Sequence, residues 1–409
     1  MTMKRTFFGV EKYLIDIQMI CSTHAILESP IAIEEIHNRL FQSIPRVWIE
    51  GEYIVHCASD QKEGNNHEPY YEIRNSRDLD VAPWVERETT FSSIDPLKSC
   101  IRVCVIKDGQ SNYANELFVA VHHALFDGRS CLRLCQQLIG DIVVDSQKWT
   151  FPNPMLLSFP PNSDIMYPID CLQFTEPSLK IPIGEGDAFK TRLHLLQLTV
   201  NETDQAKKLS KERNISMNSH ILAALAQTIK DINLSSSSLS QSNYCIRLMT
   251  PVDMRRYGKF NEEIGNIVGD IRWVLNKEDL ENKGKLGEII HQRITERIER
   301  NQSFWILQAL SQDGKYFPYK DSIAGLQNMD ISGGITNLGV TGVSGSKAKD
   351  LIFFDDYKKH SYPFNGTLGA QVLTHNGRLI LSVNLGGNVE SSVVQKILST
   401  LKINLLQSV

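Results

Sequence analysis

The sequence predicts a mixed α/β protein of two domains, each combining a sheet with covering helices. Its 409 residues exceed what one hydrophobic core usually serves. Segments with strand and helix patterns occur in both halves, and a proline-rich stretch at 151–182 separates them. Proline removes backbone donors and fixes φ, so this stretch is expected to be a linker or a long crossover.

The N-terminal half is expected to open with an element at 7–14. The pair Ser29-Pro30 combines a capping residue with a first-turn proline, and predicts a helix over 29–41. Two valine-rich apolar segments, 100–106 and 116–122, predict adjacent strands joined by a polar loop. Apolar residues at helical spacing over 128–143 predict a helix directly after the second strand.

We place the domain boundary at Gly184-Glu185-Gly186, which gives domains 1–183 and 184–409. Ser216 is expected to cap an apolar helix, and Asn376-Gly377 between alternating segments is the strongest short hairpin signal in the chain. A serine-rich surface loop is expected at 234–243. The other elements expected in this half are strands at 193–200, 244–251, 267–275, 366–375 and 378–385, and helices at 202–213, 220–232, 286–310 and 391–406.

Composition excludes several classes of function. The net charge of -4 and a pI near 6.3 give no basic surface for nucleic acid or anionic membrane. No apolar run is long enough to span a membrane, and Glu11, Lys12 and Asp16 interrupt the N-terminal apolar segment, unlike a secretory signal. The 8 cysteines form no Cys-x-x-Cys pair, so we expect a reduced, cytoplasmic protein without a zinc site.

Two adjacent histidines, His122 and His123, stand where the second predicted strand ends. Neighbouring strand residues point to opposite faces, so only one of them can reach a cleft, and the pair cannot easily share a metal. Asp127 can return toward the histidine backbone or simply cap the following helix. Gly128 allows a tight or left-handed turn. A purely structural role for all of these residues remains an alternative.

The segment His122-His123-x-x-x-Asp127-Gly128 resembles the signature of the chloramphenicol acetyltransferase-like superfamily of acyl-CoA-dependent acyltransferases. This superfamily includes nonribosomal peptide condensation domains, alcohol acetyltransferases and mycobacterial polyketide-associated acyltransferases. Three later segments resemble family segments in the same order: Pro251-Val252-Asp253-Met254-Arg255-Arg256, Gly265-Asn266-Ile267-Val268-Gly269 and Ile335-Thr336-Asn337-Leu338-Gly339.

The resemblance implies two similar α/β sandwich domains in a V, with an active-site tunnel between them. It implies His123 as general base, with His122 a structural neighbour. Asp127 would be structural and paired with an arginine of the other half, for which Arg255 is the candidate. Asn337 or Thr336 would lie near the thioester and could stabilise the oxyanion.

The expected reaction transfers an acyl group from an acyl-CoA or acyl-carrier thioester to a hydroxyl of a small-molecule acceptor. One base that titrates near neutrality suffices for it, with no covalent enzyme intermediate, no bound cofactor and no metal. A monomer is expected, since one chain would supply both sides of the tunnel.

The superfamily also includes plant acyltransferases, but their Asp-Phe-Gly-Trp-Gly segment is absent from this sequence, as are carrier-protein and adenylation segments. A free-standing enzyme of the alcohol-transferring branches is therefore expected. Two alternatives stay open: an amide-forming condensation enzyme acting on a carrier-bound substrate, and a catalytically silent acyl-binding relative.

Overall fold

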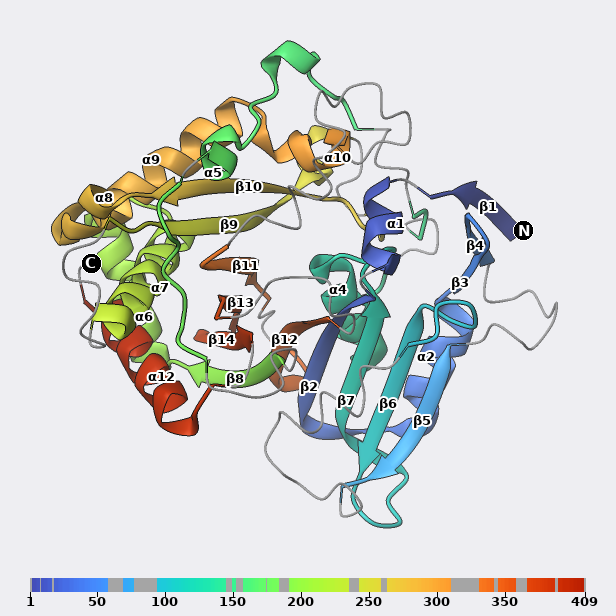
Figure 1. Cartoon of the computed structure of the whole chain (residues 1–409). Helices are drawn as coiled ribbons and strands as arrows, with labels where there is room; N and C mark the ends of the chain where they lie inside the picture. The colour runs from blue at the N-terminus through green and yellow to red at the C-terminus, as the bar shows by residue number, and fades with distance from the viewer. Residues whose placement is uncertain are drawn as a thin grey trace.

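The chain folds into two lobes that lie side by side (Figure 1). The structure is a computed structural model that describes residues 2–7, 9–16, 18–57, 69–76, 94–144, 149–151, 157–173, 175–183, 191–234, 243–258, 263–309, 331–341, 345–357, 366–386 and 389–407. The predicted mixed α/β class is confirmed, since each lobe is built on its own main sheet. Within the described ranges, no helix is long and apolar enough to cross a membrane.

The N-terminal lobe contains a five-stranded sheet in the order β12-β2-β7-β6-β5. Helix α4 packs on β2 and β7 and also contacts α2, so these two helices cover the sheet. A three-stranded sheet, in the order β1-β4-β3, lies beside it (Figure 1). The strands are β1 (Thr2–Thr6), β2 (Met19–Ala32), β3 (Arg46–Glu50), β4 (Tyr53–Cys57), β5 (Tyr70–Asn75), β6 (Ile101–Lys107), β7 (Tyr113–His122) and β12 (Ala348–Tyr357), and the helices are α1 (Gly9–Asp16), α2 (Ile33–Ser43) and α4 (Gly128–Ile139).

The C-terminal lobe contains a six-stranded sheet in the order β10-β9-β11-β13-β14-β8. Helix α7 is buried on nearly every face between α9, α12 and β11, as its apolar sequence requires. The strands are β8 (Thr191–Gln197), β9 (Ile246–Asp253), β10 (Val268–Leu275), β11 (Gly333–Val340), β13 (Leu368–His375) and β14 (Arg378–Gly386). The helices are α5 (Ile169–Gln173), α6 (Val200–Glu212), α7 (Met217–Leu234), α8 (Lys277–Glu281), α9 (Leu286–Glu299), α10 (Trp305–Ala309) and α12 (Ser391–Leu405).

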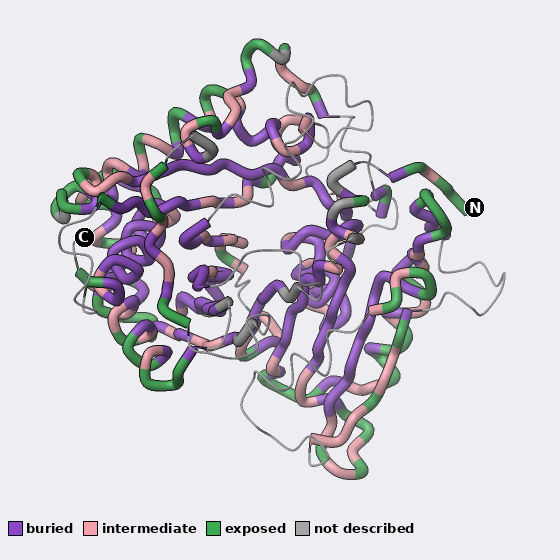
Figure 2. Tube along the Cα trace, viewed as in Figure 1, coloured by how far each residue is buried: buried purple, intermediate pink, exposed green. Residues whose placement is uncertain are grey.

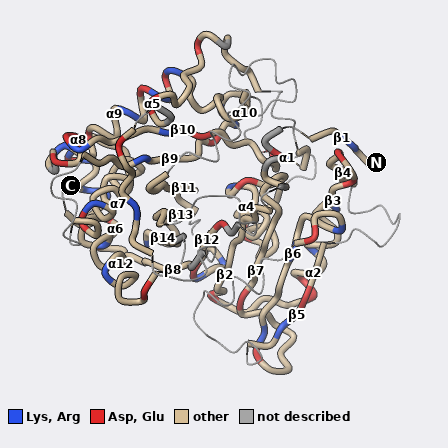
Figure 3. Tube along the Cα trace, viewed as in Figure 1, with Lys and Arg blue, Asp and Glu red and all other residues tan. Residues whose placement is uncertain are grey.

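Buried segments run through the central strands of both sheets, and exposed ones follow the outer helices and loops (Figure 2). Charged residues of both signs are interspersed over both lobes (Figure 3).

Strand β12 comes from the C-terminal half but completes the N-terminal sheet. It pairs antiparallel with β2, with Asp355 opposite Cys21 and Phe353 opposite Thr23. A cut at 183/184 therefore separates β12 from the sheet that it completes. The predicted boundary residues Gly184-Glu185-Gly186 lie outside the described residues.

Four local predictions can be compared directly with the structure. The helix expected to begin at Ser29-Pro30 is wrong at its start, because both residues belong to β2 and the helix begins at Ile33. Pro30 is tolerated since β2 has a register irregularity between Ile26 and Ile31, where pairing is interrupted.

The long helix expected over 286–310 is also interrupted. Helix α9 ends at Glu299, and Asn301 adopts a left-handed φ of 57° before α10 begins at Trp305. The hairpin of β13 and β14 is confirmed, because Asn376 and Gly377 take positive φ values of 47° and 77° at its turn. The amide of Ser219 donates to Ser216 Oγ over 3.1 Å at the start of α7, as the predicted cap requires. Residues 235–242 of the predicted serine-rich loop lie outside the described residues.

Candidate active site

The two histidines separate as strand geometry requires. His122 ends β7 with a side chain that is 1% exposed, and its Nδ1 accepts a hydrogen bond from the amide of Ala124 over 3.3 Å. Burial, with a smaller contribution from the neighbouring His123, lowers the pKa of His122 to about 4. His122 is therefore a neutral buried imidazole at neutral pH.

His123 points the other way and lines a cavity. Its backbone amide donates to the carbonyl of Met19 at the start of β2 over 2.9 Å, which fixes the residue just beyond the strand end. The imidazole is half-buried, and its Nδ1 has no hydrogen-bond partner among the described residues.

Asp127 joins the two halves of the chain through Arg255. Two guanidinium nitrogens reach the two carboxylate oxygens over 2.8 and 3.1 Å, and Asp127 is 4% exposed. The same carboxylate caps α4 by accepting from the amide of Ser130 over 2.9 Å, and it accepts from the amide of Ile267 over 3.0 Å. Asp127 thus caps α4, which is one of the two alternatives left open by its position in the turn, and it also pairs with Arg255, the candidate given by the family resemblance.

The electrostatics of this pair follow from its burial. Burial by itself raises the pKa of Asp127, but the charge of Arg255 and the donated hydrogen bonds outweigh it and hold the pKa below its usual value. Ser130 Oγ accepts from Arg255 over 3.0 Å and donates to the carbonyl of Gly265 over 2.8 Å. The glycine-asparagine segment is thereby tied to the start of α4.

Gly128 is needed for close packing rather than for an unusual φ. It is the first residue of α4 and does not take a positive φ, so of the tight and the left-handed backbone that a glycine allows, the left-handed one is not used. A Cβ at this position would lie 2.7 Å from the Phe353 ring and 3.0 Å from a Leu338 methyl. The glycine lets side chains of β12 and β11 approach the start of α4.

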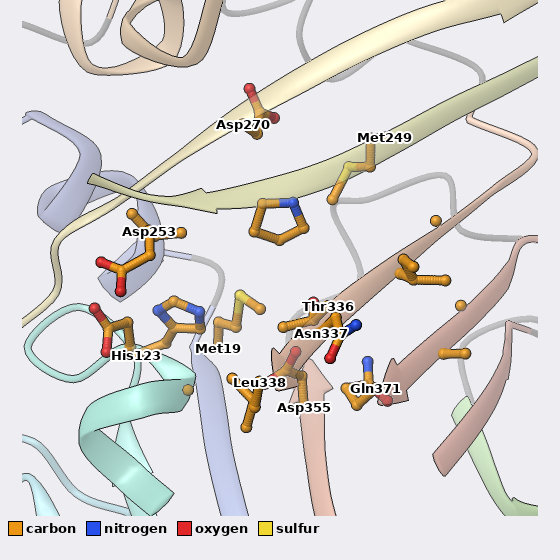
Figure 4. Close-up of a pocket in the computed structure, with 18 of the residues that line it drawn as sticks. Met19, His123, Met249, Asp253, Asp270, Thr336, Asn337, Leu338, Asp355 and Gln371 are labelled. Carbon is orange, nitrogen blue, oxygen red and sulfur yellow. The ribbon is translucent and has the colours of Figure 1, made fainter. Parts of the chain in front are cut away.

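The cavity lies between the lobes and has a volume of about 260 Å³. The N-terminal lobe contributes α1, the start of β2, the turn after β7 and β12, and the C-terminal lobe contributes β9, β10, β11, β13 and β14. Figure 4 shows His123 on one side of it and Thr336, Asn337 and Asp355 on the other.

Asn337 and Thr336 both line the cavity but differ in their hydrogen bonds. The side-chain amide of Asn337 donates to Oδ1 of Asn218 on α7 over 2.6 Å, and its Oδ1 accepts from the amide of Gly339 over 2.8 Å. Asn337 is therefore used to fix β11 against α7. Thr336 is half-buried on the cavity wall and has a hydroxyl that can donate into it.

Two residues of the cavity region, Asp355 and Cys21, were not predicted from the sequence. An imidazole nitrogen of His123, the Cys21 thiol and an Asp355 carboxylate oxygen all lie within 4.8 Å of one another. The apolar, aromatic segment 351–354 before Asp355 is a strand signal that could have revealed β12. Among the described residues these three groups come close enough to share a metal ion, but they do not fit one, because burial, together with the nearby Asp355, raises the pKa of Cys21 well above its usual value and keeps its thiol protonated.

Cys131 and Cys135 show the same effect. Both are fully buried on α4, and burial raises the pKa of Cys131 to about 12 and that of Cys135 well above its usual value. Cys131 contacts the hydroxyl of Thr23 over 3.4 Å. They behave as small core residues.

The sequence matches no protein-family model and no curated protein. Solved structures do match: the epimerization domain from the third module of tyrocidine synthetase B has a TM-score of 0.65 at 13% identity, over 99% of this chain and 96% of that one. Trichothecene 15-O-acetyltransferase from Fusarium sporotrichioides has a TM-score of 0.63 at 14% identity, over 99% and 95%. Polyketide synthase associated protein 5 from Mycobacterium tuberculosis has a TM-score of 0.60 at 14% identity, over 98% of both chains.

At these identities the likeness shows the fold. The chain shares it, over almost its whole length, with condensation-type domains and with acyltransferases. The resemblance inferred from the histidine motif is confirmed at that level.

Proposed function

We propose that the protein is an acyltransferase that moves an acyl group from a coenzyme A or acyl-carrier thioester to a hydroxyl of a small acceptor. The position of His123 supports this most directly, because its imidazole opens into the cavity between the lobes. A thioester is already activated, so one base near neutrality suffices and no enzyme nucleophile is needed.

His123 accepts the hydroxyl proton as the acceptor oxygen attacks the thioester carbonyl. The tetrahedral intermediate then collapses, the carbon–sulfur bond breaks, and the imidazolium returns its proton to the departing thiolate. An oxyanion needs a donor aimed at the place where its charge develops. Thr336 is the better candidate of the two predicted residues, because the Asn337 amide already bonds to Asn218.

The cavity walls suit an acyl chain. Met249 and Ile335 supply apolar surface, and three glycines of β11 and β13 leave the wall without side chains: Gly333, Gly334 and Gly369. Burial of an acyl chain there gains about 0.8 kcal/mol for each methylene group removed from water.

The direct test measures thiol release from a panel of acyl-CoAs with candidate alcohols. All 8 cysteines of the protein are buried, so a thiol reagent reports mainly the product. Replacing a general base costs about 10²–10⁴-fold in rate, and we expect such a loss in His123→Ala. His37→Ala, at an exposed position of α2, serves as the matched control and keeps wild-type activity. Full activity in His123→Ala would overturn the assignment.

Amide formation on a carrier-bound substrate is the second candidate. It is favoured by the likeness to condensation and epimerization domains, which covers 99% of this chain. Turnover of amines but not alcohols, with a carrier-bound thioester, would support it over O-acylation. Tight acyl-CoA binding without turnover of any acceptor would instead indicate a silent relative.

A further inference from the structure

We propose that Asp355 is a positioning residue for this site, whose carboxylate stabilises the imidazolium form of His123 during acyl transfer. The inference rests on the proposed function of His123. It concerns a residue of β12, which comes from the other half of the chain and is far from the histidine motif in sequence.

The strand pairing brings the two residues together. Asp355 lies directly opposite Cys21 in the β12–β2 register, and Met19, two residues before Cys21, accepts the hydrogen bond from the His123 amide over 2.9 Å. Both residues are therefore anchored to the same end of β2. An imidazole nitrogen and a carboxylate oxygen end within 4.8 Å of each other.

The carboxylate is held in place rather than mobile. Asp355 is 4% exposed and accepts a hydrogen bond from the Cys21 thiol. The side-chain amide of Asn384 donates to the Asp355 backbone carbonyl over 3.1 Å, which ties β12 to β14. Alternation along β12 places Phe353 and Asp355 on the same face, and both line the cavity.

The other ionisable groups near His123 are either neutral or paired. The buried thiol of Cys21 stays protonated, and His122 is neutral at neutral pH because burial lowers its pKa to about 4. Three further aspartates line the cavity, and each is close to an arginine that offsets its charge: Asp127 with Arg255, Asp253 with Arg129 and Arg255, and Asp270 with Arg272. A carboxylate oxygen of Asp355 lies within 4.8 Å of an imidazole nitrogen of His123, close enough for its negative charge to act on the imidazolium.

The charge balance of the step explains the role. The acceptor O–H bond breaks as its oxygen bonds to the thioester carbon, and the proton moves to His123, which becomes positive. An opposite charge within about 4–6 Å favours the charged form of such a group. The proton stays on the imidazole until the thiolate takes it, and Asp355 remains a carboxylate throughout.

The test compares kcat/KM from pH 5 to pH 9 for the wild type, Asp355→Asn and Asp350→Asn. Asp350 is a matched control, because it is also a carboxylate of β12, bonded to Arg378 and Gln197 instead. It lies five residues from Asp355, which is about 17 Å along an extended strand. We expect Asp355→Asn to move the acidic limb of the profile about one pH unit lower, because protonated His123 has lost its counter-charge.

At high pH the same variant is expected to lose roughly three- to tenfold in kcat/KM, because a weaker base transfers the proton more slowly. The loss narrows as the pH falls, and Asp355→Glu restores most of the profile. A uniform loss at every pH, or an unchanged acidic limb, would overturn the role of Asp355. If Asp355→Asn does not fold, Asp355→Ser is the neutral replacement with the same expected shift.

A second readout separates this inference from the proposed function. The imidazole proton resonance of His123, identified by its absence in His123→Gln, is titrated by NMR in the wild type and Asp355→Asn. A lower midpoint in the variant supports the electrostatic contact even if no acyl transfer is found. If the wild type is active but the titration midpoint of His123 is the same in Asp355→Asn, the electrostatic contact between Asp355 and His123 is contradicted. The acyltransferase proposal then still stands.

Discussion

Replacement of Arg255 by methionine tests the connection between the two halves of the site. Arg255 is 2% exposed and bonds to both oxygens of Asp127, to Ser130 Oγ and to the carbonyls of Glu263 and Gly265. Methionine keeps much of the apolar stem but supplies no charge and no donor. The change leaves a buried carboxylate without its guanidinium partner.

The expected cost follows from these contacts. Breaking a buried ion pair by removing one partner costs about 3–5 kcal/mol. Asp127 keeps its hydrogen bonds from the amides of Ser130 and Ile267, which places the expected loss near the lower end, about 3 kcal/mol. Urea unfolding of wild type and Arg255→Met at pH 7 measures it.

The pH dependence has a definite sign. In the wild type the pKa of Asp127 is depressed, so its stabilisation is present above the unfolded pKa and is lost as pH falls through the folded value. Without Arg255, burial raises that pKa, and protonation at about pH 4 relieves the orphaned charge. The difference in stability between Arg255→Met and the wild type should therefore shrink from pH 7 to pH 4.

Two further variants decide the interpretation. Arg300→Met removes an exposed arginine whose ion-pair partner among the described residues is the exposed Glu296, and should change stability by less than about 0.5 kcal/mol. Adding Asp127→Asn to Arg255→Met removes the buried charge and should recover part of the loss. A loss below about 1 kcal/mol at pH 7, or one that grows toward pH 4, would refute the reasoning.

Three other predictions concern single positions. Gly128→Ala places a Cβ 2.7 Å from a phenylalanine ring of β12 and should cost about 1–3 kcal/mol in urea unfolding, whereas Gly284→Ala, with nothing within 4 Å, should not. At Gly369 a Cβ meets only ordinary contacts near 3.8 Å, so Gly369→Val should fold and shift the preference of the enzyme toward shorter acyl-CoAs. Gly334→Ala should instead destabilise the protein, because its Cβ would lie 2.5 Å from a carbonyl oxygen. An unchanged chain-length preference in Gly369→Val would contradict the assignment of the cavity to the acyl chain. The pKa of His122 is lowered to about 4, so the unfolded chain binds the proton first, and stability is lost as the pH falls from about 6.5 toward 4. The stability of His122→Gln should depend less on pH in that window. An equal pH dependence in the variant and the wild type would contradict this role of His122.

Much of the fold could be predicted from local sequence, because strand and helix periodicity and turn chemistry act over a few residues. The strand–turn–helix unit after His122 and the Asn376-Gly377 hairpin are examples. The start at Ser29-Pro30 failed since pairing of β2 with two neighbours outweighs a local capping signal. The long predicted helix ends before Asn301, which takes a left-handed φ, and no proline in the sequence indicated this break.

The sequence by itself determined that only one of the two histidines could face a cleft, because side chains alternate along a strand whatever the surroundings, and the family resemblance selected His123. It also indicated, through a family resemblance, that Asp127 and Arg255 would meet. Only the tertiary structure decided what lies beside His123, since β12 reaches the N-terminal sheet from more than two hundred residues downstream. Asp355 and the close contact at Gly128 depend on that pairing, and no local spacing records a contact made by strands so far apart in the chain.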